Sequence, residues 1–160
     1  MPGVLSSDGL LDKKDLFEHL VVIGGGVIGM EFASIYSSLG RKVTVIEALD
    51  RILANMDKEI SQNLKMILKK RGVDFHTAAV VEEIVQAPGG GLICRYKEKD
   101  KACEVKGDGI LIATGRRAYT QGLITEESAP RYGGWRWNVD VLSQTAAFTP
   151  AFRAFTPWEM

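Results

Sequence analysis

Short apolar runs alternate with longer amphipathic segments along the first two thirds of the chain. Runs rich in β-branched residues, as expected of strands buried on both faces of a sheet, occupy residues 20–23, 43–46 and 109–113. Shorter or more mixed apolar runs predict further strands at residues 73–75 and 80–85. Apolar residues at helical spacing predict helices over residues 27–39 and 57–71.

The two predicted helices carry signals at their ends. Asp57 is placed to cap the second helix, and Gly40 and Gly72 stand where a left-handed residue would end each helix. We expect the buried faces to follow the apolar spacing. These faces would contain Val27, Ile28, Met30, Ile35 and Leu39 in the first helix, and Ile60, Leu64, Ile67 and Leu68 in the second.

A predicted hairpin completes the pattern. The turn at residues 88–91 is followed by strands at 92–96 and 102–105, joined by the polar residues 97–101. Strands that alternate with helices favour a right-handed parallel βαβαβ unit. The expected fold is therefore α/β and Rossmann-like: a parallel sheet with an added antiparallel meander, and a last strand that returns to the parallel sheet.

A glycine motif lies between the first strand and the first helix. Gly24, Gly26 and Gly29 form G-x-G-x-x-G, which alone is a weak signal. Its position directly after a buried strand and at the start of a helix is what a dinucleotide site requires. The first glycine permits the tight turn, the second allows a pyrophosphate to approach the backbone, and the third allows close packing of helix on strand.

An acidic residue ends the second strand. Glu47 follows Gly24 by 23 residues, near the spacing of about 20 for the acid that binds the ribose hydroxyls. A carboxylate there would repel a 2′-phosphate, which favours NAD over NADP. Arg51 is near enough in sequence to leave NADP open, and a solvated glutamate at a strand end is the alternative.

These motifs resemble those of a known family. The segments 21–33, 43–47 and 112–117 resemble, in the same order, the NAD-binding domain of the class I pyridine nucleotide-disulfide oxidoreductases, and most closely that of the dihydrolipoyl dehydrogenases. The resemblance covers about residues 2–123. It implies that the chain is the central NAD-binding domain of an FAD-containing enzyme, homodimeric and a member of a 2-oxoacid dehydrogenase complex.

The resemblance also implies roles for single residues. Glu47 would bind the adenosine ribose, and Val27, beside Ile28 at the start of the helix, would gate the nicotinamide. Glu31 would face the flavin and pair with a lysine of the FAD domain, although without the resemblance an exposed acid in the first helical turn is the simpler interpretation. Gly115 would lie near the nicotinamide, and Val81 would line the adenine pocket.

Composition excludes several other classes of protein. The 20 Lys and Arg residues balance 20 Asp and Glu residues, so charge gives no reason to expect a nucleic-acid or membrane partner. Two cysteines, Cys94 and Cys103, are too few for a disulfide scaffold and are nine residues apart on hairpin strands. We therefore expect a reduced, cytoplasmic protein in which the cysteines are ordinary strand residues.

Catalytic groups are not evident in the sequence. We expect neither His19 nor His76 to have a neighbouring acid in a convincing base arrangement, and we expect no metal centre. The resemblance would place the redox cysteines in an FAD domain and the catalytic His-Glu pair in an interface domain.

The last third of the chain departs from the family pattern. Residues 118–160 contain all three tryptophans and no lysine, with no sustained periodicity. Codons for Ala151–Met160, started at the third base, permit Val-Pro-Gly-Ile-Tyr-Ala-Met-Gly-Asp, which resembles the segment that follows in the family. We hypothesise a frameshift after about Leu123; an aromatic segment that packs on the domain or on a partner is the alternative.

The expected organisation has three parts: a lead-in segment from an FAD domain at residues 1–19, an NAD-binding domain at 20–117, and an aberrant or disordered tail at 118–160. The function expected is NAD(H) binding within an oxidoreductase of the dihydrolipoyl dehydrogenase type, with the chain alone inactive. The alternatives are another member of the family, such as an NADH oxidase or a mercuric or glutathione reductase, and a non-catalytic nucleotide-binding or interaction module.

Overall fold

The structure, a computed structural model, describes residues 1–115. The predictions made for Arg116, Arg117 and the tail at 118–160, the frameshift included, lie outside the described residues. Met1–Gly115 form one compact unit.

A five-stranded parallel sheet is the centre of this unit. Its strands lie in the order β1 (Val4–Leu5), β8 (Gly109–Ile112), β2 (His19–Ile23), β3 (Lys42–Glu47) and β4 (Asp74–Thr77). All four neighbouring pairs are parallel. The expected fold class is confirmed, including the return of the last strand to the sheet beside β2.

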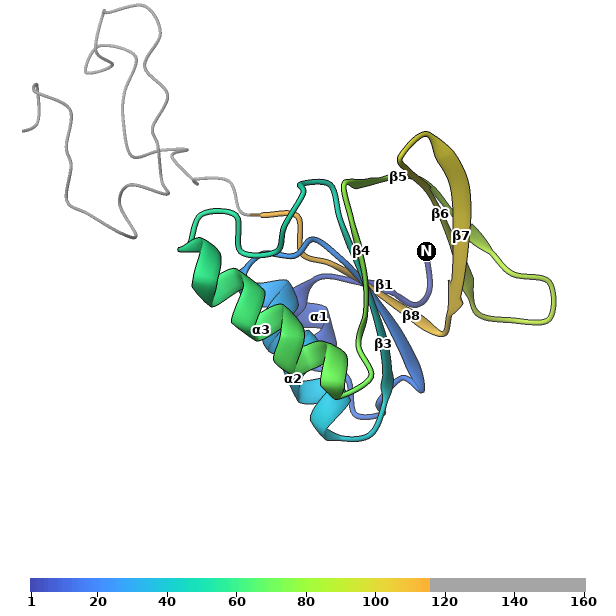
Figure 1. The fold of residues 1–160 in the computed structure, drawn as a ribbon. Coiled ribbons are helices and arrows are strands. Elements are labelled where there is room, and N and C mark those ends of the chain that lie inside the picture. The colour runs from blue at the N-terminus through green and yellow to red at the C-terminus, as the bar shows by residue number, and fades with distance from the viewer. Residues whose placement is uncertain (116–160) are drawn as a thin grey trace, which may run out of the picture. The chain divides into compact units, whose positions relative to one another are not determined.

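Helices cover one face of this sheet (Figure 1). They are α1 (Ser7–Leu11), α2 (Val27–Ser38) and α3 (Lys58–Lys70). The Asp57 side chain accepts a hydrogen bond from the Glu59 N–H at 2.8 Å, which confirms the predicted cap of α3. Gly40 and Gly72 adopt φ of 71° and 87°, as the predicted helix ends require.

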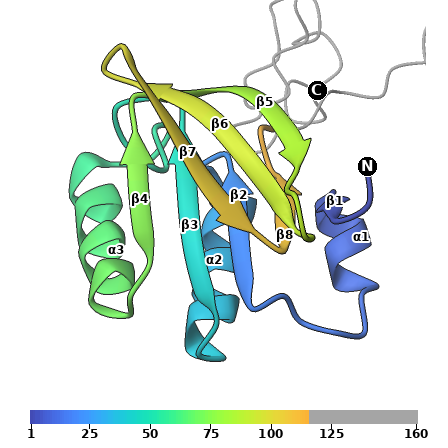
Figure 2. The same ribbon diagram turned by 90° about the vertical axis from the view of Figure 1, so that its right-hand side faces the viewer.

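A three-stranded antiparallel sheet covers the other face (Figure 2). It consists of β5 (Ala79–Gln86), β6 (Leu92–Glu98) and β7 (Lys101–Gly107) in sequence order. The hairpin strands are longer than predicted, and only Lys99 and Asp100, both with positive φ, remain between them. One apolar cluster fills the space between the helices and the parallel sheet, and a second lies between the two sheets.

The sequence pattern did not predict β1 and α1. Val4 and Leu5 pair with Ile110 and Leu111 of β8, more than 100 residues later in the chain. The residues expected as a lead-in thus contribute an edge strand of the parallel sheet. Two residues are too few to show a periodicity, so this pairing has no signature in the local sequence.

No helix among the described residues has the length and apolar character needed to cross a membrane.

The predicted buried faces of the two long helices are partly wrong. In α3, Ile60 and Ile67 are 53% and 45% exposed, while Ser61 and Leu68 are buried. Val27 and Ile35 of α2, and Leu39 just after it, are 42–54% exposed, whereas the predicted Met30 is buried. The buried face of α2 consists of Gly29, Met30, Phe32, Ala33 and Tyr36. Small side chains at two of those positions let the helix approach the sheet closely, so close packing rather than apolar periodicity sets its rotation.

Candidate functional site

The glycine motif forms the turn that joins β2 to α2. Gly24 has φ of 110°, and its N–H donates to the Ile46 carbonyl at 2.9 Å. A Cβ at Gly24 would fall well under 3.0 Å from the Ala113 carbonyl oxygen, and one at Gly29 equally near the Gly24 carbonyl oxygen. Both positions therefore require glycine because the backbones of β2, α2 and the end of β8 are in close contact.

Gly26 differs from the other two motif glycines. It is the N-cap residue of α2, no side chain in the described part of the chain caps this helix, and a Cβ at Gly26 would have nothing within 4 Å. The N–H groups of the first helical turn have no partner within the helix and lie at the positive end of its dipole. This open position fits a phosphate group of a dinucleotide.

Glu47 lies beside the glycine turn at the carboxyl end of β3. One of its carboxylate oxygens accepts the Leu49 N–H at 2.8 Å, and the other accepts the Gly25 N–H. These two bonds fix the carboxylate next to the glycine turn and leave lone pairs for further donors. The glycine motif and the strand-end acid, 23 residues apart in the sequence, thus lie side by side.

Gly25 is a site residue that the sequence reasoning missed. A Cβ there would come to 3.0 Å from both the Glu47 Oε2 atom and the Ile52 Cγ2 atom. The motif leaves this position variable, so it carries no signal of its own. Its importance depends on the loop between β3 and α3, which reaches back over the turn.

That loop, residues 48–57, packs onto the glycine turn. The Leu53 N–H donates to the Gly25 carbonyl at 2.8 Å, and Leu53 itself has φ of 47°. Ile52 is fully buried, and its carbonyl accepts the Ser61 hydroxyl at 2.6 Å. Arg51, which left NADP open, donates from Nη2 to the Ala54 carbonyl at 2.9 Å.

The other predicted site residues lie around this turn and on the second sheet. Val27 and Glu31 are exposed on α2, and Ile28 is partly buried against the helix-side core. Glu31 lies one turn beyond the start of the helix, so its placement in the first turn was wrong. Gly115 follows β8 with φ of 125° and open space at its Cβ position. Val81 lies on β5 against the cluster that contains Ile46, the residue before Glu47.

The two cysteines lie on neighbouring strands and are both free. Cys94 of β6 faces Val105 of β7, while Cys103 faces Tyr96, so the cysteines are diagonal neighbours. Burial raises the pKa of the Cys94 thiol to about 11. A diagonal separation of about 7–8 Å between Cα atoms exceeds the reach of a disulfide, so these residues do not form a redox pair in this conformation.

Both histidines have partners that the local sequence did not reveal. His19 Nε2 lies 2.9 Å from Thr44 Oγ1. His76 Nδ1 lies 2.9 Å from a Glu98 carboxylate oxygen, so the expectation that no acid neighbours it is wrong. The reason is tertiary: β4 of one sheet and β6 of the other meet there, and the His76 and Tyr96 rings lie 5.1 Å apart.

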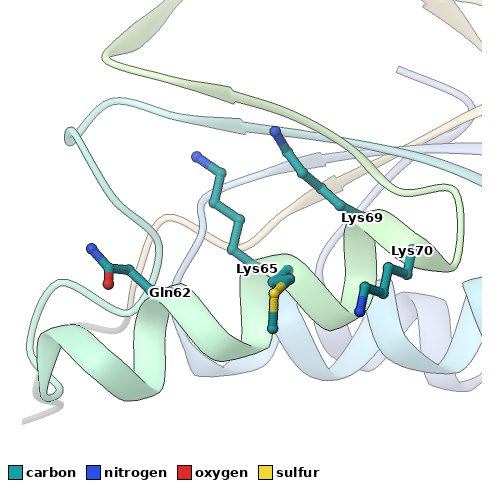
Figure 3. A pocket seen from close by; sticks show the side chains of 5 residues that line it. Gln62, Lys65, Lys69 and Lys70 are labelled. Carbon is teal, nitrogen blue, oxygen red and sulfur yellow. The ribbon is translucent and has the colours of Figure 1, made fainter.

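A shallow surface cavity lies on α3, and none of the predicted site residues lines it. Its lining consists of Gln62, Lys65, Met66, Lys69 and Lys70. Figure 3 shows Lys65 and Lys69 extending from the same side of the helix, and Lys70 from another. Lys65 reaches β4, where its Nζ is 3.3 Å from Thr77 Oγ1, and burial, together with Lys69, lowers its pKa.

Comparison with known proteins agrees with this geometry. A family model described as pyridine nucleotide-disulphide oxidoreductase matches residues 3–146. The chain belongs to the pyridine nucleotide-disulfide oxidoreductase family. The match extends beyond residues 2–123, on which the sequence resemblance was based.

Curated relatives in this family include dihydrolipoyl dehydrogenases of several organisms. The chain is 42% identical over 126 residues to the dihydrolipoamide dehydrogenase of Chaetomium thermophilum, covering 78% of this chain and 25% of that protein. It is 38% identical over 127 residues to the dihydrolipoyl dehydrogenase of Bacillus subtilis, covering 79% of this chain and 27% of that protein. The chain thus spans about a quarter of the length of these relatives.

A solved structure of the same family superposes on the described fold. The HOCl-induced flavoprotein disulfide reductase RclA from Escherichia coli matches with a TM-score of 0.65 and 39% identity, over 74% of this chain and 26% of that one. Members of this family are flavoproteins that use pyridine nucleotides. The comparisons therefore confirm two expectations from the sequence for the family: that it consists of oxidoreductases, and that these use a flavin and a pyridine nucleotide.

Proposed function

We propose that residues 1–115 bind NAD(H) across the glycine turn. The observation that carries this proposal is the position of Glu47, whose carboxylate is held by two backbone N–H groups beside the open Gly26 position. A pyrophosphate at the start of α2 would accept hydrogen bonds from the free N–H groups of the helix, and the adenosine ribose hydroxyls would donate hydrogen bonds to Glu47. The residues present fit a dinucleotide.

The same arrangement favours NAD over NADP. A 2′-phosphate would approach the Glu47 carboxylate, and like charges repel. Arg51 is the nearest arginine in the sequence, and its guanidinium already donates to the Ala54 carbonyl within its own loop. Binding a 2′-phosphate through Arg51 would therefore require that this hydrogen bond be given up.

Five further residues take roles by family resemblance. Val27 and Ile28 begin α2 beside the phosphate position, and Val27 is placed to contact a nicotinamide ring. Glu31, one turn later and exposed, would pair with a lysine of a flavin domain. Gly115 would border the nicotinamide, and Val81 would line the adenine pocket.

The reaction we propose for the enzyme to which this domain belongs is oxidation of dihydrolipoamide by NAD+, which yields lipoamide, NADH and a proton. FAD would supply the hydride chemistry in that enzyme. The part of the work done by this chain is binding and orienting the nicotinamide nucleotide. We further propose that the enzyme is cytoplasmic and homodimeric and joins a 2-oxoacid dehydrogenase complex.

A second candidate is reduction of a different disulfide or oxidant. The similarity to the E. coli disulfide reductase RclA, at 39% identity, supports it as well as the similarity to the dihydrolipoyl dehydrogenases supports the first. Both candidates use the same nucleotide site.

Calorimetric titration of the 160-residue chain tests the proposed binding. NADH should bind, and NADPH should bind about tenfold more weakly, because the carboxylate favours a ribose hydroxyl and opposes a phosphate. Glu47→Gln keeps the side-chain shape and removes the charge, so NADH affinity should fall about tenfold and the preference over NADPH should shrink. Equal affinity of the wild-type chain for NADH and NADPH would contradict the role of Glu47.

An activity assay tests the division of labour. The purified chain, supplied with FAD, dihydrolipoamide and NAD+, should form no NADH above the uncatalysed rate. The reason is that Cys94 and Cys103 are too far apart in the described structure to form a redox-active disulfide. Measurable turnover by the chain alone would refute the proposal that it is inactive by itself. It would not contradict the proposed binding of NAD(H) at the glycine turn.

A further inference from the structure

Ser61 is a buried polar residue for which the nucleotide site as described has no role. It lies in the first turn of α3, is 2% exposed, and its hydroxyl donates to the Ile52 carbonyl at 2.6 Å. Ile52 is itself fully buried, so its carbonyl has no access to water as a substitute donor. A bond of this kind holds the loop between β3 and α3 against the helix.

The same loop, residues 48–57, also holds the glycine turn in place. The Leu53 N–H donates to the Gly25 carbonyl at 2.8 Å, and the Ile52 side chain lies against Gly25, where a Cβ would come to 3.0 Å from it. Leu53 has φ of 47°, a conformation that a leucine adopts only when its surroundings hold it there. The Ser61 bond lies directly beside this strained residue.

Gly25 completes the connection to Glu47. Its carbonyl accepts from the loop, while its N–H donates to the Glu47 carboxylate. The other carboxylate oxygen accepts from Leu49, whose own carbonyl accepts the Ala78 N–H at 2.7 Å. A chain of contacts therefore runs from Ser61 through Ile52 and Gly25 to the carboxylate.

We propose that Ser61 is a positioning residue for nucleotide specificity: its hydroxyl fixes the loop that orients Gly25, and through Gly25 the Glu47 carboxylate. This inference rests on the proposed binding of NAD(H) at Glu47. Ser61 touches no nucleotide itself. Its effect would appear in the preference for a ribose hydroxyl over a 2′-phosphate, because that preference depends on where the carboxylate stands.

The test compares Ser61→Ala with Ser37→Ala in the 160-residue chain. Ser37 on α2 also donates its hydroxyl to a carbonyl, that of Ser34 at 3.0 Å, and this bond lies within the helix itself, so it controls for loss of a serine hydrogen bond. Calorimetry with NADH and NADPH should show that Ser61→Ala weakens NADH binding about fivefold and leaves NADPH binding almost unchanged. Ser37→Ala should change neither.

A double variant separates positioning from a general structural role. In the Glu47→Gln background, Ser61→Ala should cause no further loss of NADH affinity, because the residue it positions is already altered. An equal loss for NADH and NADPH, or full additivity with Glu47→Gln, would overturn the proposal. Ser61→Thr, which keeps the hydroxyl, should restore the discrimination.

A measurement without nucleotide distinguishes this inference from the proposed function. In NMR spectra of the free chain, Ser61→Ala should shift the Gly25 amide resonance and speed its hydrogen exchange, and Ser37→Ala should not. An unchanged Gly25 amide would refute the positioning role whatever the nucleotide affinity. Failure of the wild-type chain to bind NADH would instead refute the proposed function, and with it the specificity role, even if the Gly25 amide responds.

Discussion

Gly26 and Gly29 have opposite structural constraints although both belong to the glycine motif. Gly26 has φ of −74° and ψ of −175°, which alanine adopts freely, and open space at its Cβ position. Gly29 faces the Gly24 carbonyl oxygen, which a Cβ would approach far under 3.0 Å, and Val22 Cγ1 at 3.1 Å. Alanine at the two positions should therefore separate stability from binding.

The expected magnitudes follow from these distances. At Gly26 the lower entropy of the unfolded chain, about 0.4–1 kcal/mol in favour of alanine, offsets a loss of similar size at the helix cap. The free energy of unfolding should thus change by less than about 1 kcal/mol. At Gly29 the helix must move by roughly 1 Å to reach ordinary contact, and overpacking against backbone should cost about 3 kcal/mol or more.

Urea unfolding followed by far-UV circular dichroism measures the stability of each variant, and NADH titration measures binding. Gly26→Ala should unfold near the wild-type midpoint and lose at least about tenfold in NADH affinity, because the methyl group occupies the phosphate position. Gly29→Ala should unfold at a clearly lower urea concentration.

Wild-type NADH affinity in Gly26→Ala would refute the placement of the phosphates at this turn. A loss of several kcal/mol of stability in the same variant would refute the argument that its Cβ position is open. A stable Gly29→Ala would show that the helix is not held by the close contact with the Gly24 carbonyl.

Three further predictions concern residues outside the nucleotide site. Burial, aided by a neighbouring lysine, lowers the pKa of His19 below 6.5, so the unfolded chain binds its proton more readily; stability should be complete above about pH 7 and fall as the pH drops through 6.5. In urea unfolding of His19→Gln, this dependence of the free energy of unfolding on pH should disappear. An unchanged pH dependence would show that a group other than His19 causes it. Because burial raises the pKa of Cys94 to about 11, iodoacetamide at pH 8 should label Cys103 first in the folded chain, and equal rates would contradict the burial of Cys94. Replacing the positive-φ turn residues by Lys99→Asn with Asp100→Gly should raise the free energy of unfolding by about 1 kcal/mol, and a lower urea midpoint would exclude the turn geometry.

Much of the fold could be predicted because its signals are local. The β-branched runs, the cap at Asp57 and the left-handed glycines Gly40 and Gly72 each act within a few residues of chain, and the structure confirms all of them. Parallel strands joined by helices then leave few topologies, since right-handed crossovers dominate.

The candidate site was predictable in outline for a related reason. The glycine spacing and the strand-end acid are fixed by the geometry of a single βαβ unit, so Gly24, Gly26, Gly29 and Glu47 could be named in advance. The importance of Gly25 could not, because it arises from a loop that returns over the turn from a different part of the chain.

The alternation of strands and helices, the ends of the helices and the residue types that a dinucleotide requires can all be read from the amino-acid sequence. Three features emerge only when the chain is folded: which helix faces are buried, the pairing of Val4–Leu5 with the sheet, and the contact of His76 with Glu98 between two sheets. The two groups of features differ in the separation along the chain of the residues that produce them. Capping and turn conformations depend on neighbours a few residues away, whereas helix rotation, edge pairing and the orientation of Glu47 depend on close packing between segments that the sequence does not place side by side.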